Sequence, residues 1–198
     1  MKYTCLVLLT ISIFISGCSL FSPVKSKPVN TYAISTIPES VRIKSHTSTT
    51  LFVNKMDTDP MYATPKMMYT IRPYEVNYFA DNQWIENPAQ MLQSLIAQTL
   101  RKTHHYRAVS TSAMGRYDYS LNTQLIKLQQ KFMKRSSVVE LIINVQIVNL
   151  KTNQIVASRE FSACEFTTQL SPRGGVYAAN RAADKILKEI ADYVVRLT

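Results

Sequence analysis

The chain has 198 residues, of which 46% are hydrophobic and 18% are charged, and its formal net charge is +10. This composition is that of a folded protein and excludes intrinsic disorder, and the length suits one compact domain with a short appendage. No internal repeat with a period of about 20–50 residues is present, which argues against a solenoid or a propeller. The positive charge favours anionic partners, such as acidic lipid head groups or an acidic protein surface.

The first residues have the pattern of a bacterial export signal. Lys2 provides a positive start, and the apolar run that follows, CLVLLTISIFI, ends at Ile15. This run is too short to cross a bilayer, which takes about 20 apolar residues, but it suits the core of a signal peptide. Ile15, Ser16 and Gly17 directly precede Cys18, and together these four residues resemble the lipobox of bacterial lipoproteins.

The lipobox resemblance implies that residues 1–17 are a signal peptide and that Cys18 carries a diacylglycerol and an N-acyl chain. One acyl chain binds a membrane only marginally, whereas two or more anchor a protein stably. We therefore expect a permanent membrane resident of the cell envelope, with no cofactor other than this covalent lipid. The alternatives are a plain signal peptide beside an incidental cysteine, or a buried apolar helix.

The mature chain is predicted to begin with a tether and to continue as a single domain. Residues 18–30 should form the lipidated N-terminus and the tether, because this stretch holds two prolines and no periodicity. Residues 31–198 should form one α+β domain. Its first half carries short strand candidates, bounded by prolines and turn residues, over 32–34, 49–56, 67–71 and 74–79.

Stronger periodic signals follow. Asn87 and Pro88 predict the start of a helix that runs to about Lys102, since asparagine caps free amides and proline suits the first helical position. Strands are predicted over 106–109, 117–125, 139–147 and 155–166, and a second helix is predicted over 176–196 after a loop at 172–175. These elements predict a mostly antiparallel sheet with two amphipathic helices packed on one face.

No pattern typical of an active site is present. The motifs HExxH, GxSxG, CxxC, GxGxxG and the P-loop are all absent. His104 and His105 are adjacent, which does not give the spacing of a helical metal pair, so we expect surface histidines and no metal site. Cys164 lies in an alternating strand and is expected to be a small buried residue. The sequence therefore predicts a protein that is not an enzyme.

Two groups of residues are candidates for partner contacts. Trp84 is expected to pack below the first helix, and the alternative is an anchor for a partner or an acyl chain beside adaptable methionines. The second group is the basic cluster between two predicted strands. The candidate partner-binding residues are Met61, Tyr62, Met67, Met68, Tyr69, Trp84, Lys131, Lys134 and Arg135.

The order of the features resembles the auxiliary lipoproteins of ABC-type transport systems, the PqiC-like family. The similarity covers most of residues 31–197. After the lipobox and the tether, it is carried by Pro65-x-Met67-Met68-Tyr69, Asn87-Pro88, Tyr106-Arg107-Ala108-Val109 and Tyr117-Asp118-Tyr119-x-Leu121.

The resemblance implies a non-catalytic subunit of a lipid transport system, which docks an MCE-domain protein at the outer membrane and faces the periplasm. Ser19 fits export to the outer membrane, since an aspartate after the lipidated cysteine is the usual inner-membrane retention signal. Phospholipid and a second copy of the chain are further candidate partners, and nucleic acid is not expected. Two alternatives stay open: a stand-alone lipid-binding carrier, and a structural envelope or secretion-system lipoprotein.

Overall fold

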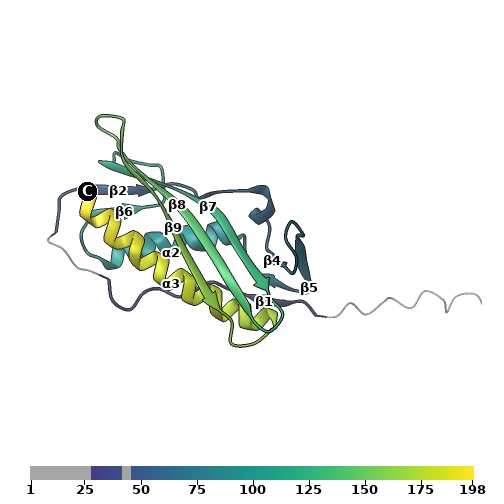
Figure 1. Ribbon diagram of the computed structural model, residues 1–198. Helices are drawn as coiled ribbons and strands as arrows, with labels where there is room; N and C mark the ends of the chain where they lie inside the picture. The colour runs from purple at the N-terminus through teal and green to yellow at the C-terminus, as the bar shows by residue number, and fades with distance from the viewer. Residues whose placement is uncertain (1–27, 42–45) are drawn as a thin grey trace, which may run out of the picture.

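The computed structural model describes residues 28–41 and 46–198 (Figure 1). The predicted signal peptide, Cys18 and most of the predicted tether therefore lie outside the described residues. Within the described ranges, nine strands form one mixed sheet, and the two α-helices pack against it, which confirms the predicted α+β class.

The strands are β1 (Asn30–Tyr32), β2 (Thr50–Val53), β3 (Asp57–Thr58), β4 (Lys66–Thr70), β5 (Asn77–Trp84), β6 (Ala108–Ser110), β7 (Tyr119–Phe132), β8 (Ser137–Asn149) and β9 (Gln154–Phe166). The helices are α2 (Pro88–Lys102) and α3 (Pro172–Leu197), and a 3-10 turn, η2, covers Pro60–Tyr62.

The long strands β7, β8 and β9 form an antiparallel ladder that is the centre of the sheet. Along the other edge of β7, the short strands β2, β3 and β4 pair in parallel, one after another. β5 forms an antiparallel hairpin with β4, β1 joins β5 in parallel, and β6 joins β2 in parallel. The long strand pairs are antiparallel, as predicted. The short strands add parallel pairs, which the alternation of apolar and polar residues in the sequence does not reveal.

β7 is longer than predicted because it contains a bulge. The pairing with β8 shifts between Leu125 and Lys127, so one extra residue lies in β7. A bulge changes which positions face the core. Leu121 and Leu125 are buried before it, and Leu128 and Gln130 are buried after it. The sequence alternation that indicated the strand therefore ends at the bulge, while the strand continues to Phe132.

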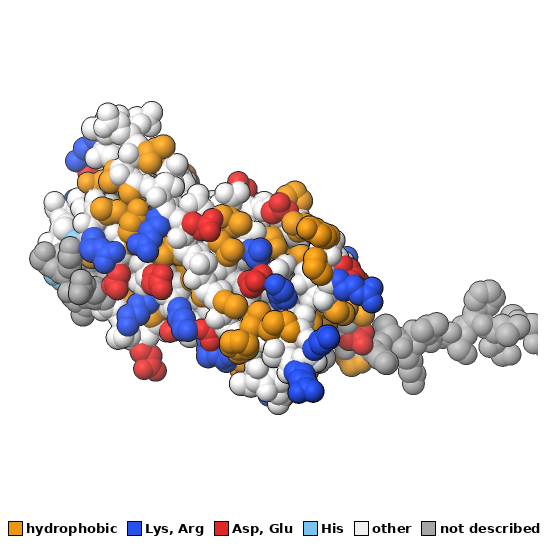
Figure 2. All heavy atoms as spheres, in the orientation of Figure 1, with side chains coloured by type: hydrophobic (Ala, Val, Ile, Leu, Met, Phe, Trp, Pro, Cys, Tyr) orange, Lys and Arg blue, Asp and Glu red, His pale blue; other side chains and the backbone are white. Residues whose placement is uncertain are grey.

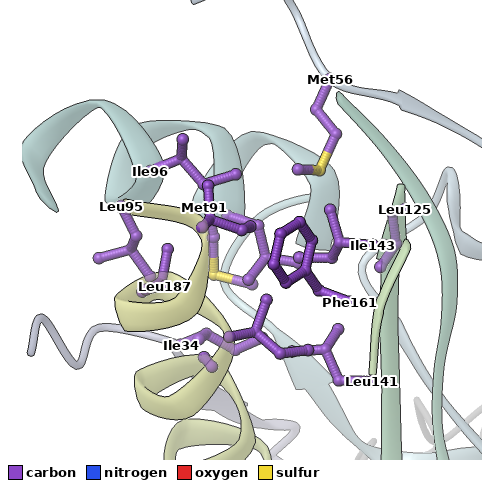
Figure 3. Packing of buried hydrophobic residues seen from close by; sticks show 14 of the residues in the cluster. Ile34, Met56, Met91, Leu95, Ile96, Leu125, Leu141, Ile143, Phe161 and Leu187 are labelled. Atoms are coloured by element: carbon purple, nitrogen blue, oxygen red, sulfur yellow. The ribbon is translucent and has the colours of Figure 1, made fainter. Parts of the chain in front are cut away.

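The core lies between one face of the sheet and the two helices. α2 contributes a stripe that includes Leu92 and Ile96, and α3 contributes one that includes Leu187. Figure 3 shows Met91, Leu187 and Phe161 pointing into the same interior space from α2, α3 and β9. Each fully buried leucine or isoleucine stabilises the fold by about 1.5–3 kcal/mol, so these stripes fix both helices to the sheet.

α3 begins at Pro172, so the predicted loop at 172–175 was wrong. Ser171 caps the helix by accepting a hydrogen bond from the Gly174 amide at 3.1 Å. A Cβ on Gly174 would lie 2.2 Å from the Gln169 carbonyl oxygen, and a Cβ on Gly175 would lie 2.2 Å from the side-chain oxygen of Gln130. The two glycines thus allow close packing at the first turn of the helix.

The strand predicted over 74–79 also begins later than expected. Arg72 to Glu75 form a turn in which the Glu75 amide donates a hydrogen bond to the Arg72 carbonyl at 3.3 Å. Tyr74 has φ +67°, a left-handed conformation that a strand cannot contain. β5 therefore starts at Asn77 and continues to Trp84, next to α2.

Candidate functional site

The predicted lipid attachment site, Cys18 with Ile15, Ser16 and Gly17, lies outside the described residues and stays a prediction. The described chain begins ten residues later, at Pro28. A fully extended chain spans at most about 3.6 Å per residue, so Pro28 can lie no more than about 36 Å from Cys18.

The segment after β1 is fixed to α3 by one side chain. The Asn180 side-chain oxygen accepts hydrogen bonds from the Ser35 amide at 2.9 Å, the Thr36 amide at 3.2 Å and the Thr36 hydroxyl at 2.9 Å. Its side-chain nitrogen donates to the carbonyl oxygens of Ala33 at 3.1 Å and Val176 at 3.0 Å. This cluster joins the N-terminal segment to the domain, so the position at which the chain enters the fold is set.

Four of the candidate partner-binding residues are core residues. Tyr62, Met67, Met68 and Trp84 are buried, and Trp84 is only 5% exposed. Burial raises the pKa of Tyr62 to about 12. The packing interpretation of Trp84 is therefore correct, and these four side chains are not surface contacts.

The remaining candidates lie at or near the surface. Tyr69 is half-buried and stacks on Phe79, with ring centroids 4.4 Å apart. Met61 is exposed in η2. Lys131, Lys134 and Arg135 are exposed at the end of β7 and in the turn that follows it. Sequence reasoning therefore located the basic cluster correctly but could not separate buried from exposed aromatic and methionine residues.

A polar cluster at the opposite end of the sheet joins β2, β7 and the β8–β9 turn. The Asp118 carboxylate accepts hydrogen bonds from the Thr50 amide and hydroxyl, both at 2.8 Å, and forms an ion pair with Lys151 at 2.8 Å. The hydrogen bond from Lys151, followed by those from Thr50, lowers the pKa of Asp118 to about 2. Both partners of Asp118 belong to neighbouring elements of the sheet, Thr50 to β2 and Lys151 to the β8–β9 turn. The cluster therefore holds these elements together.

Two further sequence expectations were wrong. His105 is buried, and its ring packs edge-on against Tyr106, whereas His104 is exposed. Cys164 is exposed, because its side chain is on the face of β9 that points away from the helices, opposite to buried Phe161.

Neither a metal centre nor a membrane span is found in the described part of the chain. No group of three or more histidine, cysteine, aspartate or glutamate residues could hold a metal ion in residues 28–41 and 46–198. In the same ranges, none of the helices has the length and apolar character needed to traverse a bilayer.

Three solved structures share the fold. A protein from Xanthomonas campestris superposes with a TM-score of 0.75 at 17% identity, over 85% of this chain and 96% of that one. An uncharacterized protein gives a TM-score of 0.70 at 12% identity, over 85% and 99% of the two chains. A hypothetical protein from Chlamydia trachomatis gives 0.53 at 7% identity, over 76% and 98%. At these identities the similarities show the fold alone.

Sequence comparison identifies the family. The chain has no match among curated protein sequences. The model of the family described as "ABC-type transport auxiliary lipoprotein component" matches residues 32–191, from the end of β1 into the last turns of α3. This match spans well over half of the chain and confirms the resemblance seen in the sequence. The chain therefore belongs to the ABC-type transport auxiliary lipoprotein component family.

Proposed function

We propose that this protein is a lipid-anchored, non-catalytic auxiliary subunit of an ABC-type lipid transport system, and that it docks an MCE-domain protein at the outer membrane, on the periplasmic side. The observation that carries the proposal is the family match over residues 32–191. The lipobox-like residues before Cys18 support the anchor, and Ser19 supports the outer membrane.

The interior of the domain supports a docking subunit over the alternative of a free lipid carrier. The apolar cavity that Met67, Met68 and Trp84 line has a volume of about 20 Å³. This is room for about one water molecule and far too little for an acyl chain. Lipid binding in this cavity would require the core to open. The larger hollow beside α3, about 890 Å³, lies open at the surface and is lined largely by polar and charged residues, among them Glu39, Arg181 and Asp184.

The titratable groups support a non-catalytic role. Asp118 is held by Lys151 and Thr50. Glu165 forms ion pairs with Lys185 and with Arg181, which lower the pKa of its carboxyl group. Asp118 lines a shallow hollow at the surface, but both carboxylates are already engaged by partners that tie secondary-structure elements together. A carboxylate that is held in this way is poorly placed to act as a general acid or base.

The anchor is tested by metabolic labelling with palmitate. The wild-type chain should incorporate the label, and Cys18→Ala should not, because the thiol is the acceptor. Cys164→Ala, which removes the other cysteine of the predicted mature chain, is the matched control and should label like the wild type. Equal labelling of wild type and Cys18→Ala contradicts the lipidation.

The partner is tested by affinity capture of the lipidated protein after gentle extraction, followed by native mass spectrometry. A docking subunit should retain an MCE-domain protein and no stoichiometric lipid. A carrier should appear as a monomer that retains phospholipid. Capture without any MCE-domain protein counts against the proposed function.

A further inference from the structure

We propose that the end of the domain at which the chain enters docks directly on a membrane surface that contains anionic phospholipid. The contact is made by residues 71–76, the β4–β5 turn, and residues 131–136, the end of β7 and the β7–β8 turn; we call these two segments the tether-side surface. The inference rests on the proposed lipidation for its orientation, since a lipid on Cys18 brings this end of the domain to the membrane.

Strand pairing places the two segments together at one edge of the sheet. β4 runs parallel to β7, with Tyr69 opposite Gln130 and Thr70 opposite Lys131, so both strands leave the sheet at the same level. β1 runs parallel to β5, with Asn30 opposite Asn82, so the chain before β1 lies toward the start of β5 and the 71–76 turn. Figure 1 shows β1, β4 and β5 grouped at this end of the molecule.

The tether-side surface exposes apolar side chains that the fold does not use. Ile71, Tyr74, Val76 and Met133 are all exposed, from two turns that lie side by side. Single exposed apolar residues are normal on a protein, but a group of them rimmed by charges marks an interaction site. Figure 2 shows hydrophobic and basic side chains together over the end of the molecule that carries β4 and β5.

Tyr74 is the strongest indication that this surface has a partner. Its side chain is fully exposed, although its backbone has φ +67°. The third position of such a turn favours glycine, because a side chain there strains the backbone. Tyr74 therefore combines an unfavourable backbone conformation with an exposed aromatic ring. Tyrosine is enriched at membrane interfaces, where its ring lies at the level of the head groups.

The charges select the kind of membrane. Arg72, Lys131, Lys134 and Arg135 lie in the two segments, against one acid, Glu75. The ion pairs found in the described part of the chain include none of these four cations. Unpaired cations near an anionic bilayer strengthen binding by about fivefold each. Apolar side chains interleaved with free cations complement phospholipid head groups better than they complement a neutral surface.

Because the chain between Cys18 and the domain is short, even a weak contact between the tether-side surface and the membrane is enough for docking. The tether-side surface is confined near the bilayer, because Pro28 can lie at most about 36 Å from Cys18. A contact within one anchored molecule acts at a high effective concentration, so modest affinity gives a docked state.

A fluorescent probe at residue 74 tests the contact in the full-length lipidated protein. The background is Cys164→Ser, which removes the exposed thiol, and the probe position is Tyr74→Cys carrying an environment-sensitive fluorophore. In vesicles of equal parts phosphatidylcholine and phosphatidylglycerol, the emission should shift to the blue and spin-labelled lipid should quench it. The control variant is Leu150→Cys, which carries the same fluorophore at an exposed apolar position in the β8–β9 turn, at the opposite end of the sheet. Its emission should stay the same with and without vesicles.

Charge removal tests the lipid chemistry. Lys131→Gln, Lys134→Gln and Arg135→Gln should each reduce the ratio of docked to undocked protein about fivefold, and high salt should reduce it as well. The matched controls are the single variants Arg107→Gln, Arg116→Gln and Lys188→Gln. Each removes one charge from an exposed residue outside the surface and should leave the ratio unchanged.

These measurements distinguish membrane docking, the preference for anionic lipid and the lipidation of Cys18 from one another. A probe at residue 74 that stays in water on mixed vesicles overturns docking, and so does a shift that appears only after an MCE-domain protein is added. A shift of the same size on pure phosphatidylcholine overturns the anionic preference. The mass of the Cys18 peptide reports lipidation independently, so failure of the anchor is recognised apart from failure of the docking surface.

Discussion

Asn180 on α3 holds Thr36 twice, because its side-chain oxygen accepts hydrogen bonds from both the backbone amide and the hydroxyl of that residue. The two residues are far apart in the chain, and Ile34 between β1 and Thr36 is buried in the core. The segment that follows the predicted tether is thus part of the folded domain. Its attachment determines the end of the domain at which the chain enters the fold.

Asn180→Ala should lower the free energy of unfolding by about 1–3 kcal/mol, because the partly buried Thr36 amide and Ala33 carbonyl lose their hydrogen bonds to this side chain. Urea titration measures the loss, and hydrogen exchange should show faster exchange at the amides of Ser35 and Thr36. Asn180→Asp keeps the accepting oxygen and should retain more protection at these amides. Equal exchange in Asn180→Ala and wild type would show that the cluster does not hold the segment.

Gly175→Ala should destabilise the protein by about 1–2 kcal/mol, although alanine favours a helix over glycine by about 1 kcal/mol. The reason is that its Cβ would meet the side chain of Gln130, which is itself held by hydrogen bonds to Ser137 and the Ser171 carbonyl. A double-mutant cycle with Gln130→Ala should show coupling, since the double variant removes the clash. Additive losses would contradict the close approach.

The Asp118 cluster should make the free energy of unfolding fall at low pH. A pKa of about 2 in the folded state, below the ordinary 3.8, means that the carboxylate stabilises the fold above about pH 4 and that this contribution is lost as pH falls towards 2. The contribution should be about 1 kcal/mol or less, because the ion pair with Lys151 is at the surface. The free energies of unfolding of the wild type and of Asp118→Asn should become equal as the pH falls from about 4 to 2. A constant difference down to pH 2 contradicts the assignment.

Tyr74→Gly should raise the free energy of unfolding by about 0.5–1 kcal/mol, since glycine adopts a positive φ without strain but gains freedom in the unfolded chain. The thermal midpoint of the protein in detergent measures the gain, and Tyr78→Gly, at an ordinary strand position, should instead destabilise. A stabilised variant that no longer docks on mixed vesicles would show that the strain serves binding. A Tyr74→Gly protein of unchanged or lower stability contradicts the strain argument.

Local signals predicted the helices and the long strands. α2 begins at Pro88 and ends at Lys102 as predicted, because Asn87 caps the Ala89 amide and an apolar stripe marks its length. The start of α3 was missed, since two glycines next to a proline are typical of a loop. Their role depends on Gln130 and Gln169, which the fold brings close and which no local pattern connects.

The proposed docking surface was only partly predictable from the sequence. Lys131, Lys134 and Arg135 form a basic run that is visible in the sequence and exposed in the structure. Met67 and Met68 looked like adaptable surface residues, but both are buried where β4 meets the core. Tyr74 gave no signal, because its exposure and its positive φ belong to a turn that the sequence analysis had assigned to a strand.

The length of the central strands sets the distance between the two ends of the sheet. β8 has thirteen residues, from Ser137 beside the tether-side surface to Asn149 at the far turn. At about 3.3 Å per residue, it is roughly 43 Å long. In the docked state that we propose, a ladder standing upright on the bilayer would hold the far turn, with Leu150 and Lys151, about four nanometres above the lipid.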